Sequence, residues 1–170
     1  MPNDETVSRK LLKAKFDELL IPLGFSRKFS TWLRNNEETT FGVNIERWPM
    51  FESYFINLWV WFSPEITPRK KTPPDLAARI EDLLDGEEKA QFLLRCDFEL
   101  DATVSDEDKV ADVTRYLKDI GLAWLEGRRR LPEIEKILTE GRIKVDRQLT
   151  SEGWQKLRER LGLGATKEQA

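Results

Sequence analysis

The spacing of apolar residues changes from a helical to an extended period near residue 25. Leu12, Phe16 and Leu19 recur at intervals of four and three residues, which predicts an amphipathic helix over about residues 6–20. A proline and a glycine follow closely and favour a stop there. The chain therefore opens with a helix whose apolar face needs a surface to pack against.

Apolar and polar residues then alternate, as in β-strands. The clearest segments are Thr39–Trp48 and Ser53–Phe62, and Phe29–Arg34 is a shorter one. Polar or proline-containing connections of hairpin length separate them, so we expect an antiparallel meander. Because Ser53–Phe62 is apolar on both faces, we expect it inside the sheet and not at its edge.

The middle of the chain predicts one further helix and one further strand. After a proline-rich loop, Asp75–Leu84 has a helical spacing of leucine and isoleucine, with Gly86 as its stop signal. Gln91–Leu100 returns to alternation, with Cys96 on the apolar face, and predicts a strand.

The last third of the chain is predicted to be mainly helical. Ser105 and the three acids after it form a helix start, and an apolar stripe runs from Val110 to Trp124. Further helices are expected from about Pro132 and over Ser151–Leu161, whereas Arg142–Gln148 is ambiguous and fits a short strand.

The order of elements predicts one α+β domain. We expect it to span residues 1–162, with a mostly antiparallel sheet of about four to five strands and helices packed on one side. Residues 163–170 then form a polar C-terminal tail.

Composition removes most catalytic and metal chemistry. The chain has no His and one Cys, which excludes His-containing metal sites, Cys₄ zinc sites and an internal disulfide. It contains neither the G-x-S-x-G nor the S-x-x-K motif, and its glycines are too scattered for a phosphate-binding loop. We therefore expect no enzyme activity, and we assign no catalytic, cofactor-binding or metal-binding residues.

Two features of the predicted strand Gln91–Leu100 bear on possible chemistry. Cys96 lies among apolar residues, which favours an inert core thiol. Asp97, Glu99 and Asp101 share the opposite face, where they either coordinate a hard cation, meet a basic partner or simply face solvent. The solvated face is the favoured interpretation.

Charge and hydropathy argue against nucleic acid and membrane partners. Lys and Arg number 28 against 31 Asp and Glu, so 28 − 31 gives a net charge of −3. The basic runs Arg69–Lys71 and Arg128–Arg130 are best explained as solvated loop charge. The longest apolar segment, Leu58–Phe62, is far too short to span a bilayer, and the N-terminus has no signal-peptide pattern, so we expect a cytoplasmic protein.

Aromatic residues are concentrated around the strongest predicted strand. Six of them lie within fourteen positions, and core packing explains only one face of that strand. Helices, a partner or a ligand must cover the other face, and Trp and Tyr commonly anchor protein interfaces. A protein partner is the leading hypothesis, and the alternative is a small molecule between sheet and helix that contacts Trp59 or Trp61. The candidate interaction residues are Trp48, Phe51, Trp59 and Trp61.

The order of several short motifs resembles a bacterial family of uncharacterised proteins, catalogued as domain of unknown function 4304. The matching stretches are Leu23–Lys28 with Thr31–Arg34, Val43–Glu46 leading to Phe55–Val60, and Ala123–Leu125 before Leu131–Leu138. The chain departs from the family pattern at Ile56–Trp59, where a glycine-containing run is expected. The resemblance implies an α+β fold and no known activity, and similar small domains resemble immunity proteins of toxin systems.

Overall fold

The centre of the molecule is one antiparallel sheet in which five strands follow each other in chain order. The computed structural model describes residues 5–66, 72–140 and 151–162. The meander and the α+β class are confirmed, and the fourth strand lies inside the sheet as expected. The strands are β1 (Ser26–Lys28), β2 (Thr31–Asn35), β3 (Thr40–Arg47), β4 (Tyr54–Trp61) and β5 (Leu76–Arg79).

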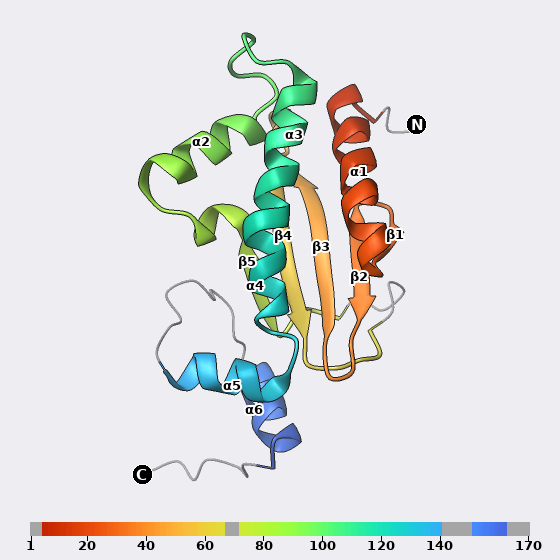
Figure 1. The fold of residues 1–170 in the computed structure, drawn as a ribbon, viewed down its shortest axis with the longest axis vertical. Helices are drawn as coiled ribbons and strands as arrows, with labels where there is room; N and C mark the ends of the chain where they lie inside the picture. The colour runs from red at the N-terminus through yellow and green to blue at the C-terminus, as the bar shows by residue number, and fades with distance from the viewer. Residues whose placement is uncertain (1–4, 67–71, 141–150, 163–170) are drawn as a thin grey trace.

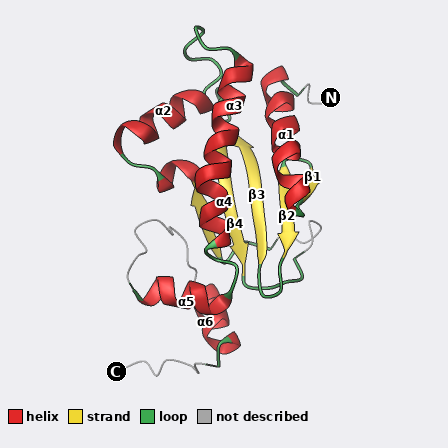
Figure 2. Cartoon of the chain, in the orientation of Figure 1, coloured by secondary structure: helices red, strands yellow, loops and turns green. Residues whose placement is uncertain are grey.

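Helices cover one face of this sheet (Figure 1, Figure 2). Helix α1 (Val7–Leu20) lies beside the run formed by α3 (Asp106–Tyr116), a π-helical turn (Leu117–Gly121) and α4 (Leu122–Glu126). Helix α2 (Gly86–Cys96) packs against α3. Two more, α5 (Leu131–Thr139) and α6 (Ser151–Arg160), lie beyond the end of the sheet that carries the β2–β3 turn.

Local sequence explains where the two covering helices begin. The Thr6 hydroxyl accepts a hydrogen bond from the Arg9 N–H at the start of α1. The Ser105 hydroxyl accepts the Asp108 N–H at the start of α3, where three acids complement the positive end of the helix dipole. These caps confirm the helix starts expected near residues 6 and 105.

The core is the layer between these helices and the sheet. Leu12 and Phe16 of α1 are fully buried in the same cluster as the apolar residues of β3 and β4, and the Phe16 ring lies 5.4 Å from that of Trp32 on β2. A Cβ at Gly121 would lie 3.0 Å from Leu117 Cδ1 and 3.4 Å from Leu58 Cδ2. Glycine at this position therefore lets the α3–α4 run approach β4 closely. The strand residues of the layer are Trp32, Phe41, Val43, Ile45, Tyr54, Ile56, Leu58, Val60, Leu76 and Ala78.

The helix expected over Asp75–Leu84 is wrong. Leu76–Arg79 is instead the edge strand β5, and Ile80–Leu83 is a short 3₁₀ helix. Asp75 does not cap a helix, because its Oδ2 accepts the Phe62 N–H at 2.6 Å and thereby joins β5 to the end of β4. Pairing with β4 overrides the local helical spacing.

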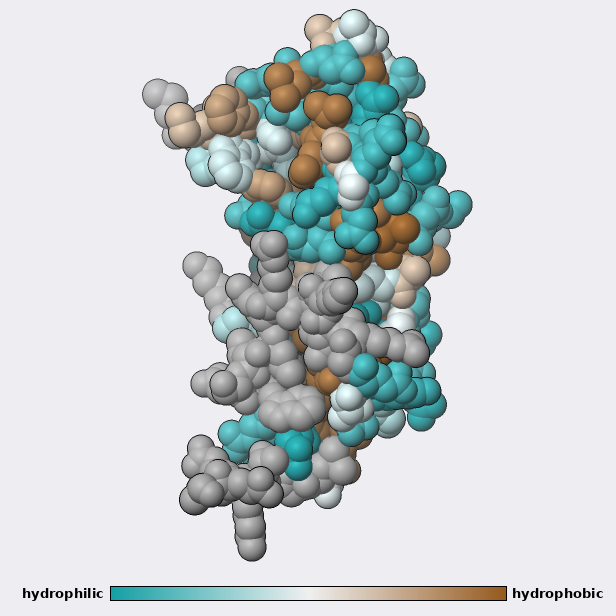
Figure 3. Space-filling view, turned by 90° about the vertical axis from the view of Figure 1, so that its left-hand side faces the viewer, coloured by the Kyte–Doolittle hydropathy of each residue, from teal (hydrophilic) through white to brown (hydrophobic). Residues whose placement is uncertain are grey.

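The strand expected over Gln91–Leu100 is also wrong. Residues 86–96 form α2, in which Phe92 and Cys96 lie one helical turn apart and are both buried. Figure 3, the side view onto α2, shows apolar patches in the upper half of a largely hydrophilic surface, and Leu93 and Leu94 are among the exposed apolar residues. Gly86 begins this helix and does not end the preceding one.

Three expectations concern residues that are not described: the basic run at 69–71, the ambiguous segment 142–148 and the polar tail 163–170. The last helix is present as α6. Within the described residues, no helix combines the length and the apolar character needed to cross a bilayer.

Candidate functional site: the open face of the sheet

The two faces of the sheet differ in how they are covered. Helices α1 to α4 all belong to the side that carries the apolar core. The opposite side, which we call the open face, carries the other half of the alternating residues. On β4 these are Phe55, Asn57, Trp59 and Trp61.

A ladder of polar side chains crosses the centre of the open face. The strand register places Thr31, Asn44, Asn57 and Arg79 opposite one another on β2 to β5. Asn44 Nδ2 donates to Thr31 Oγ1 at 2.9 Å, Asn57 Nδ2 donates to Asn44 Oδ1 at 3.2 Å, and Arg79 Nε donates to Asn57 Oδ1 at 3.3 Å. These partly buried polar groups therefore satisfy each other.

Aromatic rings flank this ladder at the β3–β4 end. The Arg79 guanidinium lies 4.0 Å from the centroid of the Phe55 ring, and the Trp48 ring meets Phe55 edge-on at 5.1 Å. Glu46 accepts a hydrogen bond from Asn57 Nδ2 at 2.9 Å and lies 3.6 Å from Arg79 Nη2. Cation–π contact, ion pair and hydrogen bond together hold Arg79 in one orientation.

A tryptophan pair lies on the other side of the ladder. Trp59 and Trp61 meet edge-on at 5.8 Å, and Trp61 Nε1 donates to the Thr72 carbonyl at 3.0 Å. Trp61 is only 5% exposed. A Cβ at Gly42 would lie 2.8 Å from Trp61 Cζ3, so the ring occupies the space that a larger side chain would fill. Trp61 thus serves the packing of the sheet, and Trp59 remains half-exposed beside it.

A hollow of about 450 Å³ opens beside Trp59 on this face. Its size is within the range of roughly 300–1,000 Å³ typical of small-molecule sites. Neither Trp59 nor Trp61 lies between the sheet and a helix, contrary to what the sequence led us to expect. A small ligand that contacts either residue would lie on the open face. The hollow is lined by Glu46, Asn57, Trp59, Ala77, Arg79 and Asp82, among others.

The other two candidate residues lie at the tip between β3 and β4. Trp48 is 42% exposed and Phe51 is 49% exposed, and Met50 between them is 80% exposed. The tip is fixed by the Trp48 N–H, which donates to the Ser53 carbonyl at 2.8 Å, and by a bridge between Ser53 and Asp97. The structure therefore brings Trp48 and Phe51 to one exposed end, next to the open face.

No family model matches the chain, and no match to a curated protein or a solved structure was found. The resemblance stated from the sequence motifs accordingly stays a prediction.

The carboxylates expected to share a strand face do not do so, because Asp97 to Asp101 follow α2 as a loop. Asp97 Oδ1 accepts the N–H groups of Glu99 and Leu100, and Asp101 Oδ1 accepts that of Thr103. Glu99 Oε1 accepts the Glu52 N–H. These side chains stabilise turns, and within the described residues no group of three or more acids and thiols is placed to hold a metal ion.

Cys96 is buried near the end of α2 and not on a strand. Burial raises the pKa of its thiol well above the ordinary value, and the Glu81 and Asp97 carboxylates act in the same direction. The thiol therefore stays protonated at neutral pH and is a poor nucleophile.

The polar ladder is the part of the site that the sequence did not reveal. Asn44 and Asn57 look like ordinary solvent-facing strand residues, and Arg79 falls in a segment with helical spacing. Only the strand register places these three side chains in one row. An asparagine in the centre of two successive apolar strands was the one available signal.

Proposed function

We propose that this chain is a non-enzymatic, cytoplasmic protein-binding module that contacts its partner with the open face and the β3–β4 tip. The observation that carries the proposal is a group of aromatic side chains away from the helices: Trp48 and Phe51 are exposed, and Trp59 is partly exposed. Large aromatic side chains of this kind supply most of the binding energy in protein interfaces. An immunity-type interaction, suggested only by analogy with other small α+β domains, is one form of this proposal.

Several side chains of the open face are already held in place by their neighbours, and this supports binding of a macromolecule. Arg79 is already fixed by Phe55, Asn57 and Glu46, and Trp48 is packed against Phe55. Side chains that are ordered before association lose little conformational entropy when a partner arrives. A satisfied polar centre with aromatic groups beside it also matches the composition of known interfaces, in which Trp, Phe and Arg are enriched.

Affinity capture from the native host, with mass spectrometry, tests the proposal. The tagged wild-type chain should retain one stoichiometric protein, and Trp48→Ala combined with Phe51→Ala should weaken its binding at least about tenfold. Ile21→Ala is the matched control, because Ile21 is equally exposed but lies after α1, away from the open face. Equal retention by the double variant, or turnover of a substrate by the purified chain, would contradict the proposal.

A small-molecule ligand is the second candidate, and the hollow beside Trp59 favours it. A metabolite that binds there should quench tryptophan fluorescence and raise the Tm of the wild-type chain. Trp59→Ala should abolish both effects. A flat response across broad metabolite libraries would remove this candidate.

A further inference from the structure

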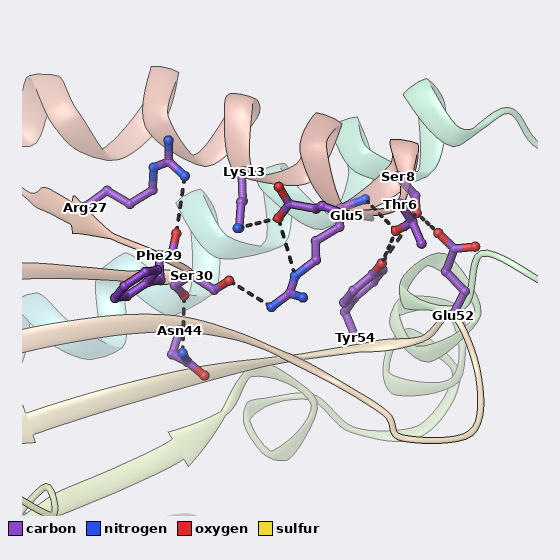
Figure 4. Close-up of polar contacts among 11 residues, drawn as sticks. Glu5, Thr6, Ser8, Lys13, Arg27, Phe29, Ser30, Asn44, Glu52 and Tyr54 are labelled. Atoms are coloured by element: carbon purple, nitrogen blue, oxygen red, sulfur yellow. Dashed lines mark hydrogen bonds and ion pairs between the residues drawn. The ribbon is translucent and has the colours of Figure 1, made fainter. Parts of the chain in front are cut away.

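A second hollow lies on the helix side of the sheet, between the start of α1 and the turn joining β1 to β2. Its volume is about 420 Å³. Figure 4 shows Glu5 and Lys13 on one side of this space and Ser30 of the turn on the other. The walls comprise Thr6, Arg9, Lys13, Phe29, Ser30 and Arg47, with Glu5 at the helix start.

Positive charge dominates this hollow in a protein whose net charge is −3. Arg9, Lys13 and Arg47 line it and Glu5 is its one carboxylate, so 3 − 1 gives a local charge of +2. Lys13 Nζ forms an ion pair with Glu5 Oε1, and Arg9 Nε lies 3.7 Å from the same oxygen. Among the residues that the structure describes, Arg47 forms neither a side-chain hydrogen bond nor an ion pair. One carboxylate therefore faces three cations.

The hollow also holds a buried donor that has an ion pair but no hydrogen bond. Arg9 Nη2 donates to Ser30 Oγ at 2.9 Å, but the buried Arg9 Nε has no hydrogen-bond partner in the described part of the chain. The hydrogen bond and charge of Lys13, together with the charge of Arg9, hold the pKa of Glu5 below its ordinary value although burial acts the other way. The site thus favours an anionic oxygen at the position where Glu5 Oε1 now lies.

An aromatic ring forms the rim. Phe29 is 79% exposed and has φ of 57°, which is uncommon for a bulky residue. The turn is held by Arg27 Nη1, which donates to the Phe29 carbonyl at 3.2 Å, and by the Ile45 N–H, which donates to the Ser30 carbonyl at 2.9 Å. The ring is therefore a flat apolar surface at the edge of a cationic hollow.

We propose that this hollow binds a small phosphorylated molecule, with its phosphoryl oxygens on Arg9, Lys13 and Arg47 and a flat ring on Phe29. A phosphoryl group with two negative charges matches the local charge of +2, and guanidinium groups bind its oxygens in pairs. A hollow of about 420 Å³ holds a ligand much larger than phosphate alone. The ligand competes with Glu5 for Lys13 and Arg9.

This proposal is independent of protein binding by the open face. Arg47 pairs with Tyr54 across β3 and β4, and the Tyr54 hydroxyl is hydrogen-bonded to Thr6 at the start of α1. Arg47 therefore lies on the helix side of the sheet, not on the open face. Loss of partner capture with retained phosphate binding, or the reverse, separates the two proposals. Many phosphate sites use the N–H groups of a glycine-rich loop. In this hollow, cationic side chains of a helix and a strand would bind the phosphoryl group instead.

Isothermal titration at low salt tests the site with adenosine 5′-monophosphate, inorganic phosphate and adenosine. We expect the monophosphate to bind the wild-type chain, phosphate to bind about tenfold more weakly and adenosine not to bind. Arg47→Ala should lower the affinity for the monophosphate about tenfold or more, because one charged hydrogen-bonding group is lost. Lys15→Ala is the matched control, since Lys15 is exposed on the same helix and pairs with Glu18 outside the hollow.

Two further variants separate ligand binding from a structural role. Glu5→Gln removes the competing carboxylate and should raise the affinity for both phosphate probes several-fold. Phe29→Ala should weaken binding of the monophosphate and leave that of inorganic phosphate unchanged. The proposal is overturned if neither probe binds wild type or Glu5→Gln, if Lys15→Ala weakens binding as much as Arg47→Ala, or if an aspartate-rich peptide binds the hollow and both phosphates fail.

Discussion

At the scale of single residues, Glu81 is a buried carboxylate whose burial is not fully offset by its neighbours. Its side chain is 7% exposed, and Oε2 has no hydrogen-bond partner within the described chain. Burial raises the pKa of Glu81 above its ordinary value of 4.5, so the folded protein binds this proton more tightly than the unfolded chain does. The contribution of Glu81 to the free energy of unfolding should therefore fall as the pH rises from about 4.5 through the raised pKa, and then level off.

Glu81→Gln should remove this pH dependence. The neutral amide avoids the burial of a charge, so we expect the variant to be more stable than wild type at pH 7, by about 1 kcal/mol. Thermal unfolding followed by circular dichroism between pH 4 and 8 measures the effect. Glu37→Gln, which changes an exposed turn residue, should leave the profile of wild type unchanged. A Glu81→Gln profile parallel to that of wild type would show that the carboxyl does not titrate in this window.

Residue patterns separate the two faces of β4 but not the roles of residues within one face. Trp59 and Trp61 alternate in the same way, and the sequence predicts both as candidates for interaction. The difference arises from Gly42, which leaves room for the Trp61 ring, and from the Thr72 carbonyl, which accepts its N–H. Both partners are distant along the chain, so local spacing carries no information about them.

At the scale of elements, α3 holds the loop that follows α2. Lys109 of α3 is almost fully buried, and its Nζ donates to the carbonyls of Asp97 and Leu100 and lies 5.8 Å from the Phe98 ring centroid. Lys109→Met keeps the length of the side chain but leaves two carbonyls without this donor. We expect a loss of about 2 kcal/mol in the free energy of unfolding and faster amide hydrogen exchange over residues 97–104.

Lys118→Met is the matched control for this change. Lys118 follows α3 in the same helical run and is exposed. Its replacement should change the free energy of unfolding by no more than about 0.5 kcal/mol and should leave amide hydrogen exchange over residues 97–104 unchanged. Equal stability and exchange in the Lys109 and Lys118 variants would mean that the loop is held by its turns alone.

Elements with a long, clear period were predictable, and the two elements between residues 75 and 100, β5 and α2, were not. The α1 and α3–α4 stripes and the strands β3 and β4 each repeat their period over several residues, whereas the three exposed residues of β1 have no period and were not predicted as a strand. Phe92 and Cys96 are four residues apart, which is about one turn of a helix and also two repeats of a strand. Their spacing therefore fits both structures. At β5, four residues pair with β4 before a 3₁₀ turn, too few to establish a period.

At the scale of the whole molecule, a sheet on which helices α1 to α4 all cover the same face explains why fold and site differ in predictability. The covered face is made of apolar residues whose burial the alternating pattern dictates. The open face depends on cross-strand register, and the cationic hollow depends on where α1 meets a turn more than twenty residues away. Both candidate sites are thus products of tertiary structure with no continuous motif.

The boundary expected at residue 162 makes α6 part of the same domain, and the contacts of this helix give that expectation a test. Leu157 is fully buried, Lys156 Nζ lies 3.3 Å from Asp75 Oδ2, and Arg160 Nη1 donates to the Glu38 carbonyl at 3.0 Å. A chain that ends at residue 140 should lose about 3 kcal/mol in the free energy of unfolding, because a buried leucine and the contacts at the ends of β4 and β5 disappear together. Urea denaturation followed by tryptophan fluorescence measures this loss, and a chain ending at 162 should match the full-length protein. If the chain ending at 140 is equally stable, α6 does not belong to the domain that contains the sheet.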